Sequence, residues 1–497
     1  MRLERKKEQK NQKGKKKYTD ILAGLYIVSI VVFIISVLMV NVLPLTYFII
    51  LILVLSFVSL IILLSLLKKN VKIGGGRENK KDKKNIAASV AAIVMILITS
   101  TGTYYMANTL DFFSKISDKS TTHNFYVIVK ADSKYDELKD IDKKTVAVMN
   151  QEDEIYAKAQ KKLKEKVDVR LERKGQFDDL TKSLLNDKTE IIFMNSAYYE
   201  MAIEDIEGFT SENTRIIEEI IVEVEPNTEL NVKSVDVTKE PFNIYISGID
   251  TTGSIGNISR SDVNMVMTVN PKTKTILLTS IPRDYYVKLA TKDAMDKLTH
   301  SGLYGIEETT KTVENLLGID INYYVKVNFT TVVKLVDTLG GITVNSEYSF
   351  SALGMDNVTY NYVAGPNNLN GQAALAFARE RYSFASGDNQ RVKNQQAVLT
   401  GIIKKCTGST SILTNYNGIL NAIEDNIQTS MSQKDITSLV KMQLGDMSGW
   451  TIKHCSLRGS GSSTTVYSIP NSYVYVMVPD QESVDEAKSQ ISSVISE

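Results

Sequence analysis

Three long apolar runs near the N-terminus set the first limit on what this chain can fold into. They are Ile21–Val42, a second run that follows a break around Pro44 and continues through Leu67, and Ile86–Met106. Each run has about the ~20 residues that a helix needs to cross ~30 Å of hydrocarbon. We therefore predict three membrane-spanning helices, and three full-length runs argue against a single cleaved signal peptide.

Basic residues lie before the first run and between the second and third runs. The first 17 residues contain nine Lys or Arg, Lys68–Lys84 contains eight more, and the loop between the first two runs contains none. Because short cytoplasmic loops are enriched in Lys and Arg, both basic segments are predicted to lie in the cytoplasm. Three crossings then place everything after Met106 outside the cell. The basic tail is explained by orientation and lipid contact.

The remainder of the chain is acidic. Residues 1–85 contain 17 basic and 5 acidic residues, against 58 and 57 in the whole chain, which leaves 41 basic and 52 acidic residues in 86–497. An acidic body binds the phosphates of nucleic acid poorly. This distribution argues against a DNA-binding regulator, and no nucleic-acid partner is expected.

Cysteine and histidine give little sign of a site. The two cysteines, Cys406 and Cys455, both lie in the last hundred residues. Outside the cell a disulfide between them is allowed, and two free thiols are an equal alternative. The histidines at 123, 300 and 454 are scattered and indicate no zinc site.

Short strands and helices alternate between Phe125 and Val224. Such alternation is typical of an α/β unit. The stretch around residues 129–146 is faintly similar to one lobe of a solute-binding protein, and a structural spacer is the equal alternative. A polar linker, Glu225–Glu240, separates this unit from the next.

The residues that point to chemistry come after Pro241. A predicted strand, Phe242–Gly248, ends just before Asp250, and the next strand begins just after Asp262. A strand–loop–strand arrangement can bring these two carboxylates together, and Arg260 points the same way as Asp262 in an extended segment. Two carboxylates beside an arginine suit a divalent cation bound with phosphate oxygens. The alternative is that each aspartate only caps a loop.

More arginines follow at the ends of predicted elements. A third strand, Thr275–Ile281, stops before Arg283, and a helix through Ala373–Phe377 ends at Arg379-Glu380-Arg381. In the helix after Asp388, Arg391 and Gln395 share one face. Arginine is suited to phosphate because its planar fork donates two hydrogen bonds at once. Taken alone, residues 379–381 would more often form a solvated ion-paired surface.

These motifs occur in a fixed order that resembles a known family. The series is Gly248-Ile249-Asp250, Arg260-Ser261-Asp262, Ile281-Pro282-Arg283-Asp284, Phe377-Ala378-Arg379-Glu380-Arg381 and Asp388-Asn389-Gln390-Arg391 followed by Gln395-Gln396. It resembles the LytR-CpsA-Psr domain over about residues 242–396. The N-terminal helices and the extra extracellular unit resemble the capsule-associated branch of that family. One departure is Asn394, which stands where many members have a further arginine.

The resemblance implies an α/β fold. We expect an α-β-α sandwich with a mixed central sheet, preceded by a smaller α/β accessory domain and three transmembrane helices. The expected boundaries are 1–106 for the basic tail and membrane helices, 107–235 for the accessory domain and linker, and 236–497 for the catalytic domain. The expected location is a multi-pass protein in the cell membrane of a Gram-positive-type envelope, in contact with the lipid bilayer.

The resemblance also implies a function. Members of the family are expected to move a polyprenyl-pyrophosphate-linked glycopolymer, such as a capsule or teichoic-acid-like glycan, onto peptidoglycan. Asp250 and Asp262 would hold Mg2+, with Mn2+ as the alternative. The pyrophosphate would be bound by Arg260, Arg283, Arg379, Arg381, Arg391 and Gln395, and the catalytic set would be Asp250, Asp262, Arg260 and Arg283. A pyrophosphatase that acts on the same donor and a membrane-bound regulatory or sensory module are the alternatives.

Overall fold

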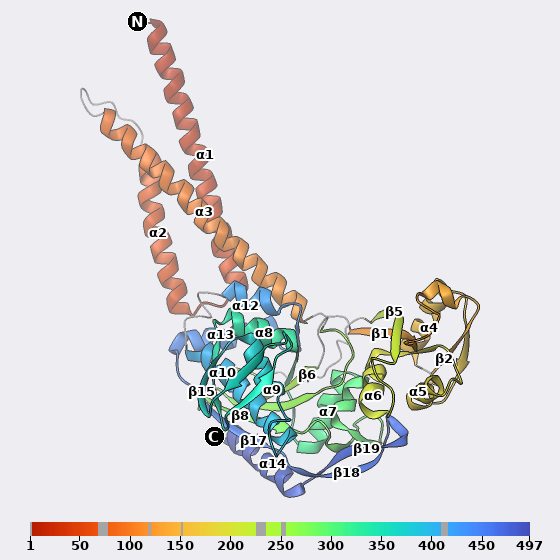
Figure 1. Cartoon of the computed structure of the whole chain (residues 1–497). Coiled ribbons are helices and arrows are strands. Elements are labelled where there is room, and N and C mark those ends of the chain that lie inside the picture. The colour runs from red at the N-terminus through yellow and green to blue at the C-terminus, as the bar shows by residue number, and fades with distance from the viewer. Residues whose placement is uncertain are drawn as a thin grey trace. The chain divides into compact units, whose positions relative to one another are not determined.

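The computed structural model describes residues 2–67, 78–117, 121–150, 153–224, 235–249, 255–408 and 416–497. These residues belong to two compact units (Figure 1). One unit comprises Met1–Ser114 with Gln433–Met447, and the other comprises Lys115–Ser432 with Ser448–Glu497.

Three long helices make up most of the first unit. They are α1 (Arg2–Val40), α2 (Leu45–Leu67) and α3 (Glu78–Ser117), and α13 (Gln433–Asp446) belongs to the same unit. The segments Lys17–Val40, Leu45–Leu67 and Ile86–Ile116 are long and apolar enough to cross a membrane. Hydroxyl groups within them donate hydrogen bonds to carbonyl oxygens of the preceding turn, and Ser59 Oγ, for example, lies 2.5 Å from Leu55 O. Such bonds are needed because a polar group in hydrocarbon has no water to bind. The prediction of three helices of spanning length is confirmed.

The second unit begins with a five-stranded sheet in the order β3-β2-β4-β1-β5. Strand β1 is antiparallel to β4 and β5, whereas β2 is parallel to β3 and β4. The predicted α/β character of this region is confirmed. The elements are β1 (Thr121–Lys130), η1 (Leu138–Ile141), β2 (Thr145–Val148), α4 (Glu154–Lys166), β3 (Arg170–Arg173), α5 (Phe177–Leu185), β4 (Ile192–Asn195), α6 (Ser196–Asp205) and β5 (Thr214–Val224).

The hydrophobic core of this sheet includes residues from the far end of the chain. Phe125, Tyr156 and Phe193 stack at its centre. The hairpin β18 (Gly459–Val466) and β19 (Ile469–Pro479) adds four buried side chains to the same cluster: Val466, Ile469, Val474 and Val476. This five-stranded sheet, which we call the accessory sheet, therefore shares its core with the C-terminal hairpin (Figure 1).

A six-stranded mixed sheet forms the rest of the second unit, in the order β16-β11-β6-β7-β8-β17. Neighbours β6, β7 and β8 are antiparallel, while β11 runs parallel to β6 and β17 runs parallel to β8. All seven residues of β8 are buried, so the sheet is covered on both faces. The strands are β6 (Phe242–Ile249), β7 (Val263–Asn270), β8 (Thr275–Ile281), β11 (Tyr323–Asn328), β16 (Ile427–Thr429) and β17 (Thr451–Ser456).

Two groups of helices cover this sheet. Helices α7 (Ile306–Leu317) and α14 (Gln481–Ser496) share one apolar cluster with sheet residues such as Tyr245 and Leu277. Helix α8 (Phe329–Thr338) lies beside β11, and α10 (Asp388–Gly408) lies beside β8 and β17. The predicted α/β sandwich with a mixed central sheet is confirmed. The remaining elements are β9 (Tyr286–Lys288), β10 (Met295–Lys297), η2 (Leu298–Tyr304), β12 (Ile342–Ser346), β13 (Phe350–Leu353), β14 (Thr359–Tyr362), β15 (Gly365–Leu369), α9 (Gly371–Arg379) and α12 (Tyr416–Ile423).

Both cysteines are free thiols, so the disulfide alternative does not hold in this structure. Burial raises the pKa of Cys406 to about 11 and also raises the pKa of Cys455. Because the thiolate is the reactive form, both side chains are poor nucleophiles at neutral pH.

Candidate active site

The candidate site forms where β6 ends and β7 begins. Strand β6 stops at Ile249, directly before Asp250, and its register sets Gly248 opposite Val263. The backbone N–H of Asp262 donates to the carbonyl of Gly248 at 2.8 Å. The two strand ends therefore meet as predicted. Asp250 itself lies outside the described residues.

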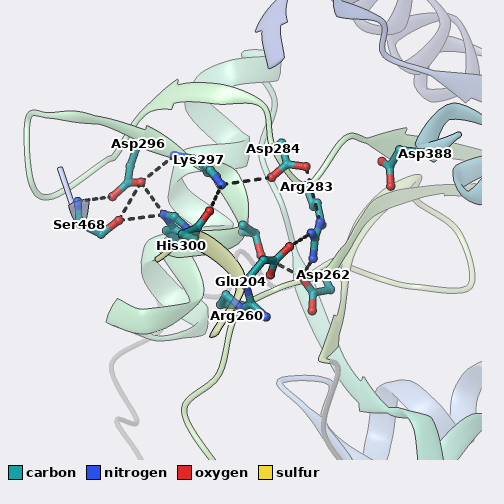
Figure 2. A network of polar contacts seen from close by, with 12 residues as sticks. Glu204, Arg260, Asp262, Arg283, Asp284, Asp296, Lys297, His300, Asp388 and Ser468 are labelled. Carbon is teal, nitrogen blue, oxygen red and sulfur yellow. Dashed lines mark hydrogen bonds and ion pairs between the residues drawn. The ribbon is translucent and has the colours of Figure 1, made fainter. Parts of the chain in front are cut away.

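A buried network orients the segment that carries Arg260 and Asp262. The Ser261 hydroxyl lies 3.0 Å from the hydroxyl of Tyr245 and 2.8 Å from that of Ser247. Since Ser261 is fixed into the core, its two neighbours point the other way, as the alternation of an extended segment predicts. Figure 2 shows Glu204 with Arg260 and Arg283 as its partners, and Asp262 paired with Arg283.

Backbone hydrogen bonds join this segment to the one that carries Arg283. The N–H of Ser261 donates to the carbonyl of Thr299 at 3.0 Å, and the N–H of Thr299 donates to the carbonyl of Arg283 at 2.8 Å. A Cβ on Gly302 would lie 2.5 Å from the carbonyl oxygen of Ser259, so the close approach here requires glycine. The two arginines are thus held by a continuous backbone connection.

Charged side chains meet in a compact group at this point. The Arg283 guanidinium lies 2.9 Å from Asp262 Oδ1, which also accepts a hydrogen bond from the Thr299 hydroxyl at 3.1 Å. Glu204, from the last turn of α6, accepts from Arg260 with one carboxylate oxygen and from Arg283 with the other. The arginine side chains are only 10% and 11% exposed. One carboxylate therefore bridges two buried guanidinium groups.

The charges in this group are mutually supporting. Burial alone would raise the pKa of Glu204, but Arg260 and Arg283 outweigh it and lower this pKa to about 2. The pKa of Asp262 is likewise below its ordinary value, because the same two arginines overcome the cost of burial. Both carboxylates are therefore ionised at neutral pH.

Asp284 differs from its neighbours. Burial raises its pKa, and attraction to Arg283 and Lys297 opposes this shift only in part. Its carboxylate lies 3.6 Å from Arg283 Nε and 3.8 Å from Lys297 Nζ. A buried carboxylate with a raised pKa is suited to proton transfer.

Arg391 and Arg381 extend the positive side of the site. Arg391 is 13% exposed and ion-paired with Asp388. Burial lowers its pKa, and the charges of Asp388, Arg283, Asp262 and Arg381 also act on it. The structure therefore brings Arg391 and Arg381 into the electrostatic neighbourhood of Arg283 and Asp262.

Arg379 and Gln395 are less closely tied to this group. The Arg379 guanidinium lies 4.5 Å from the centroid of the Phe329 ring. Gln395 is partly exposed on α10, one turn after Arg391. Asn394, the residue that departs from the family pattern, is buried and donates to the carbonyl of Phe377 at 3.2 Å. It joins α10 to α9, so it is turned away from solvent.

A second buried network lies next to the first (Figure 2). His300 Nδ1 lies 2.8 Å from Asp296 Oδ1, and the Ser468 hydroxyl contacts both side chains. Lys297 reaches Asp205 of α6 at 3.1 Å. This network joins α6, the η2 turn and the C-terminal hairpin behind the arginine pair.

Sequence reasoning missed Glu204 and Asp205. They lie on helix α6, which packs against β1 and β4, whereas the arginines lie beside β7 and β8 of the six-stranded sheet. Glu204 precedes Arg260 by 56 positions. One signal was available: two consecutive acidic residues close helix α6. Acidic side chains are unfavourable at that end of the helix dipole, so they indicate a cationic partner elsewhere in the fold.

Comparison with known proteins decides the family. The LytR_cpsA_psr family model matches residues 209–492, more than half of the chain. The chain belongs to the LytR-CpsA-Psr family.

Several relatives carry a transferase name. The polyisoprenyl-teichoic acid–peptidoglycan teichoic acid transferase TagU of Bacillus subtilis is 38% identical over 232 residues, which cover 46% of this chain and 72% of the relative. TagU of Enterococcus faecalis is 38% identical over 227 residues, with 45% and 72% covered. A crystal structure of B. subtilis TagU is 34% identical, covers 52% of this chain and 97% of that one, and has a TM-score of 0.41.

The family match includes the arginines of the site but not Glu204. Arg260, Asp262, Arg283 and Arg391 all lie within the LytR-CpsA-Psr segment. Glu204 and the rest of helix α6 lie before its first matched residue, 209. The carboxylate that bridges the arginine pair thus comes from outside the matched domain.

Proposed function

We propose that this LytR-CpsA-Psr protein is a transferase that moves a polyprenyl-pyrophosphate-linked cell-wall glycopolymer onto peptidoglycan. The observation that carries the proposal is the buried pair Arg260 and Arg283, which already holds an anionic group beside Asp262. The name shared by the TagU relatives, which describes transfer of polyisoprenyl-linked teichoic acid to peptidoglycan, supports it.

Donor binding would rest on the arginines. Arg260 and Arg283 present guanidinium groups that are spaced to hold two oxygens of one anion, as their shared contact with Glu204 demonstrates. Planar guanidinium groups bind phosphate oxygens with paired hydrogen bonds. Arg391 and Arg381 would add positive charge on one side. Arg379, the last residue of α9, and Gln395, one turn after Arg391 on α10, would add further donors.

The residues present fit a magnesium ion. Within the described ranges no group of three or more His, Cys, Asp or Glu side chains could hold a metal. Mg2+ does not require one, since it uses one or two carboxylates and takes its other ligands from phosphate and water. Asp262, which stays ionised, would hold it together with Asp250, and Mn2+ is the alternative. When bound, the ion would neutralise charge on the pyrophosphate.

The reaction would be a phosphoryl-type transfer. A hydroxyl oxygen of the peptidoglycan sugar forms a bond to the sugar-linked phosphorus of the donor, and the bond from that phosphorus to the bridging oxygen breaks. The electron pair leaves with polyprenyl phosphate, and the hydroxyl proton passes to a base. Asp284, with its raised pKa, is suited to accept that proton. Positioning and charge neutralisation by the arginines would supply most of the rate.

The membrane helices would keep enzyme and donor at one surface. A polyprenyl tail leaves the bilayer at a cost of ~0.8 kcal/mol per CH2. The nine basic residues among the first 17 and the eight in Lys68–Lys84 favour a cytoplasmic N-terminus. The second unit would then lie outside the cell, where peptidoglycan is found.

The test uses the full chain in lipid nanodiscs, with a lipid-linked donor, Mg2+, and peptidoglycan either present or absent. We expect polymer to be joined to peptidoglycan only when both substrates are present. Asp262→Asn and Arg283→Ala should each lower the rate by about 100-fold or more. Arg458→Ala is the matched control, because that arginine is 56% exposed in surface ion pairs.

Two results would contradict the proposal. Release of free phosphorylated glycan at the same rate without acceptor would identify a pyrophosphatase. Attachment that survives both site substitutions would favour the regulatory module.

A further inference from the structure

Helix α6 of the accessory sheet presents a negative end to the arginine pair. Its last two residues are Glu204 and Asp205, and the C-terminal end of a helix dipole is itself negative. Glu204 contacts Arg260 and Arg283, while Asp205 contacts Lys297 at 3.1 Å. Two acidic side chains and a helix end therefore face three cations of the LytR-CpsA-Psr domain.

The accessory sheet also contacts the loop that follows Asp250. The N–H of Thr122 in β1 donates to the carbonyl of Gly256 at 2.7 Å, and the N–H of Ile258 donates back to the Thr122 carbonyl at 2.9 Å. The carbonyl of the residue between them, Asn257, accepts from buried Lys326 at 2.7 Å. The accessory domain thus contacts the loop at residues 256–258 as well as the arginine pair.

Charge shows what this contact does to an incoming anion. Arg260 and Arg283 are balanced by Asp262 and Glu204, so the four side chains form a neutral group. Glu204 uses donors on both guanidinium groups. A pyrophosphate that enters while Glu204 stays would add negative charge beside two carboxylates and would find these donors already engaged.

We infer that Glu204 is an affinity-determining residue of the donor site: a carboxylate supplied by the accessory domain that occupies the pyrophosphate position on Arg260 and Arg283 and must leave when the donor binds. The inference rests on the proposed function, because it takes these two arginines as the pyrophosphate contacts. It gives the accessory domain a role, since α6 becomes a built-in competitor whose position sets how much donor is bound.

When the donor replaces Glu204, the hydrogen bonds that are lost are replaced by new ones. Glu204 gives up its hydrogen bonds to the two guanidinium groups, and phosphate oxygens accept from the same nitrogens. Asp205 and Lys297 lie behind the pair and need not separate. The apparent affinity of the donor is then its affinity for the open site multiplied by the fraction of molecules in which Glu204 is displaced.

The experiment measures binding of geranyl pyrophosphate with Mg2+ to the full chain in detergent, by calorimetry. Glu204→Gln removes the charge with little change of shape, and Glu204→Ala removes the carboxylate altogether. Both should bind the probe about tenfold more tightly than the parent chain, since the competing charge is gone. Glu207→Gln is the matched control: it makes the same charge change at an exposed residue just beyond α6 that has no ion pair within the described ranges, and it should bind as the parent does.

A second measurement does not depend on any substitution. Hydrogen exchange of the α6 amides in the parent chain should become faster when the probe binds, because Glu204 has been released. Slower exchange, or probe binding by Glu204→Gln that is equal to or weaker than that of the parent, would overturn the inference.

Arg283→Ala separates this inference from the proposed function. Loss of probe binding in Arg283→Ala, without a gain in Glu204→Gln, would leave the donor site standing and remove the competitor role. Unchanged binding in Arg283→Ala would overturn the donor site, and this inference with it.

Discussion

Single buried charges show how this fold tolerates groups that a core normally rejects. Lys326 is buried in β11, where its ammonium group donates to the carbonyl of Asn257. Burial lowers the pKa of Lys326 to about 8. Asp262 and the partly exposed Glu204 show the opposite case, because nearby arginines lower their pKa values although burial acts to raise them. What surrounds each group therefore decides its charge.

Lys326 makes the stability of the protein depend on pH. Its pKa is lower in the folded chain than in the unfolded one, so between about pH 8 and pH 10 the unfolded chain binds more protons and stability rises with pH. We expect this rise in the urea midpoint to disappear in Lys326→Met. Lys334→Met, at an exposed lysine of α8, should retain it. An unchanged profile in Lys326→Met would contradict the assignment.

Asp284 gives a second prediction at this scale. Its pKa is raised, so the stability it contributes is present at low pH and is lost as pH rises through the folded pKa. At neutral pH, Asp284→Asn should therefore leave the free energy of unfolding unchanged or raise it by about 1 kcal/mol. Polymer transfer should fall if the carboxylate accepts the proton. A lower thermal midpoint in Asp284→Asn would show that its ion pairs outweigh its burial.

Secondary-structure elements explain why some site residues could be predicted and others could not. Asp262 and Arg283 stand at the ends of strands whose apolar runs are readable, and β8 lies at Thr275–Ile281 as expected. Alternation along residues 260–262 was also enough to set the side chains' directions. Glu204 could not be found this way, because its contact with the arginines depends on how one sheet packs against another. The acidic pair that ends α6 indicates a cationic partner, but it does not identify which one.

The Asn394 departure can be tested on helix α10. Its amide bonds to Gln390 and to the carbonyl of Phe377, both at 3.2 Å, in a buried position. Introducing the family's arginine as Asn394→Arg should destabilise the fold by about 2 kcal/mol or more, because it buries a larger, charged group. The thermal midpoint reports this effect. Lys393→Arg, at the exposed neighbouring position, should be neutral, and equal midpoints for the two variants would refute the structural role.

At the scale of the whole molecule, the second unit is held together by elements that are distant in sequence. The β18–β19 hairpin completes the accessory core, and Ser468 between its strands joins the Asp296–His300 network. The expected boundary near residue 235 could not reveal this, since the hairpin lies more than 220 positions later. Hydrophobic periodicity identifies a strand but not the sheet whose core it completes.

The shared core yields a prediction about the accessory domain. Ile469 is fully buried there, so Ile469→Ala should cost about 2–5 kcal/mol of stability. The loss should appear as faster hydrogen exchange in β1 and β4, although the substitution lies in the C-terminal hairpin. Tyr473→Ala is the control, at a side chain on the same strand that is 78% exposed. Exchange that rises only within the hairpin would indicate that the accessory core is independent.

The hairpin also imposes an order of events during synthesis. The strands of the accessory sheet are made first, yet four side chains of their core are encoded after residue 465. Domains usually fold as units while the chain emerges, starting from the N-terminus. This one must wait, with part of its apolar surface open, until residues 466–476 have left the ribosome.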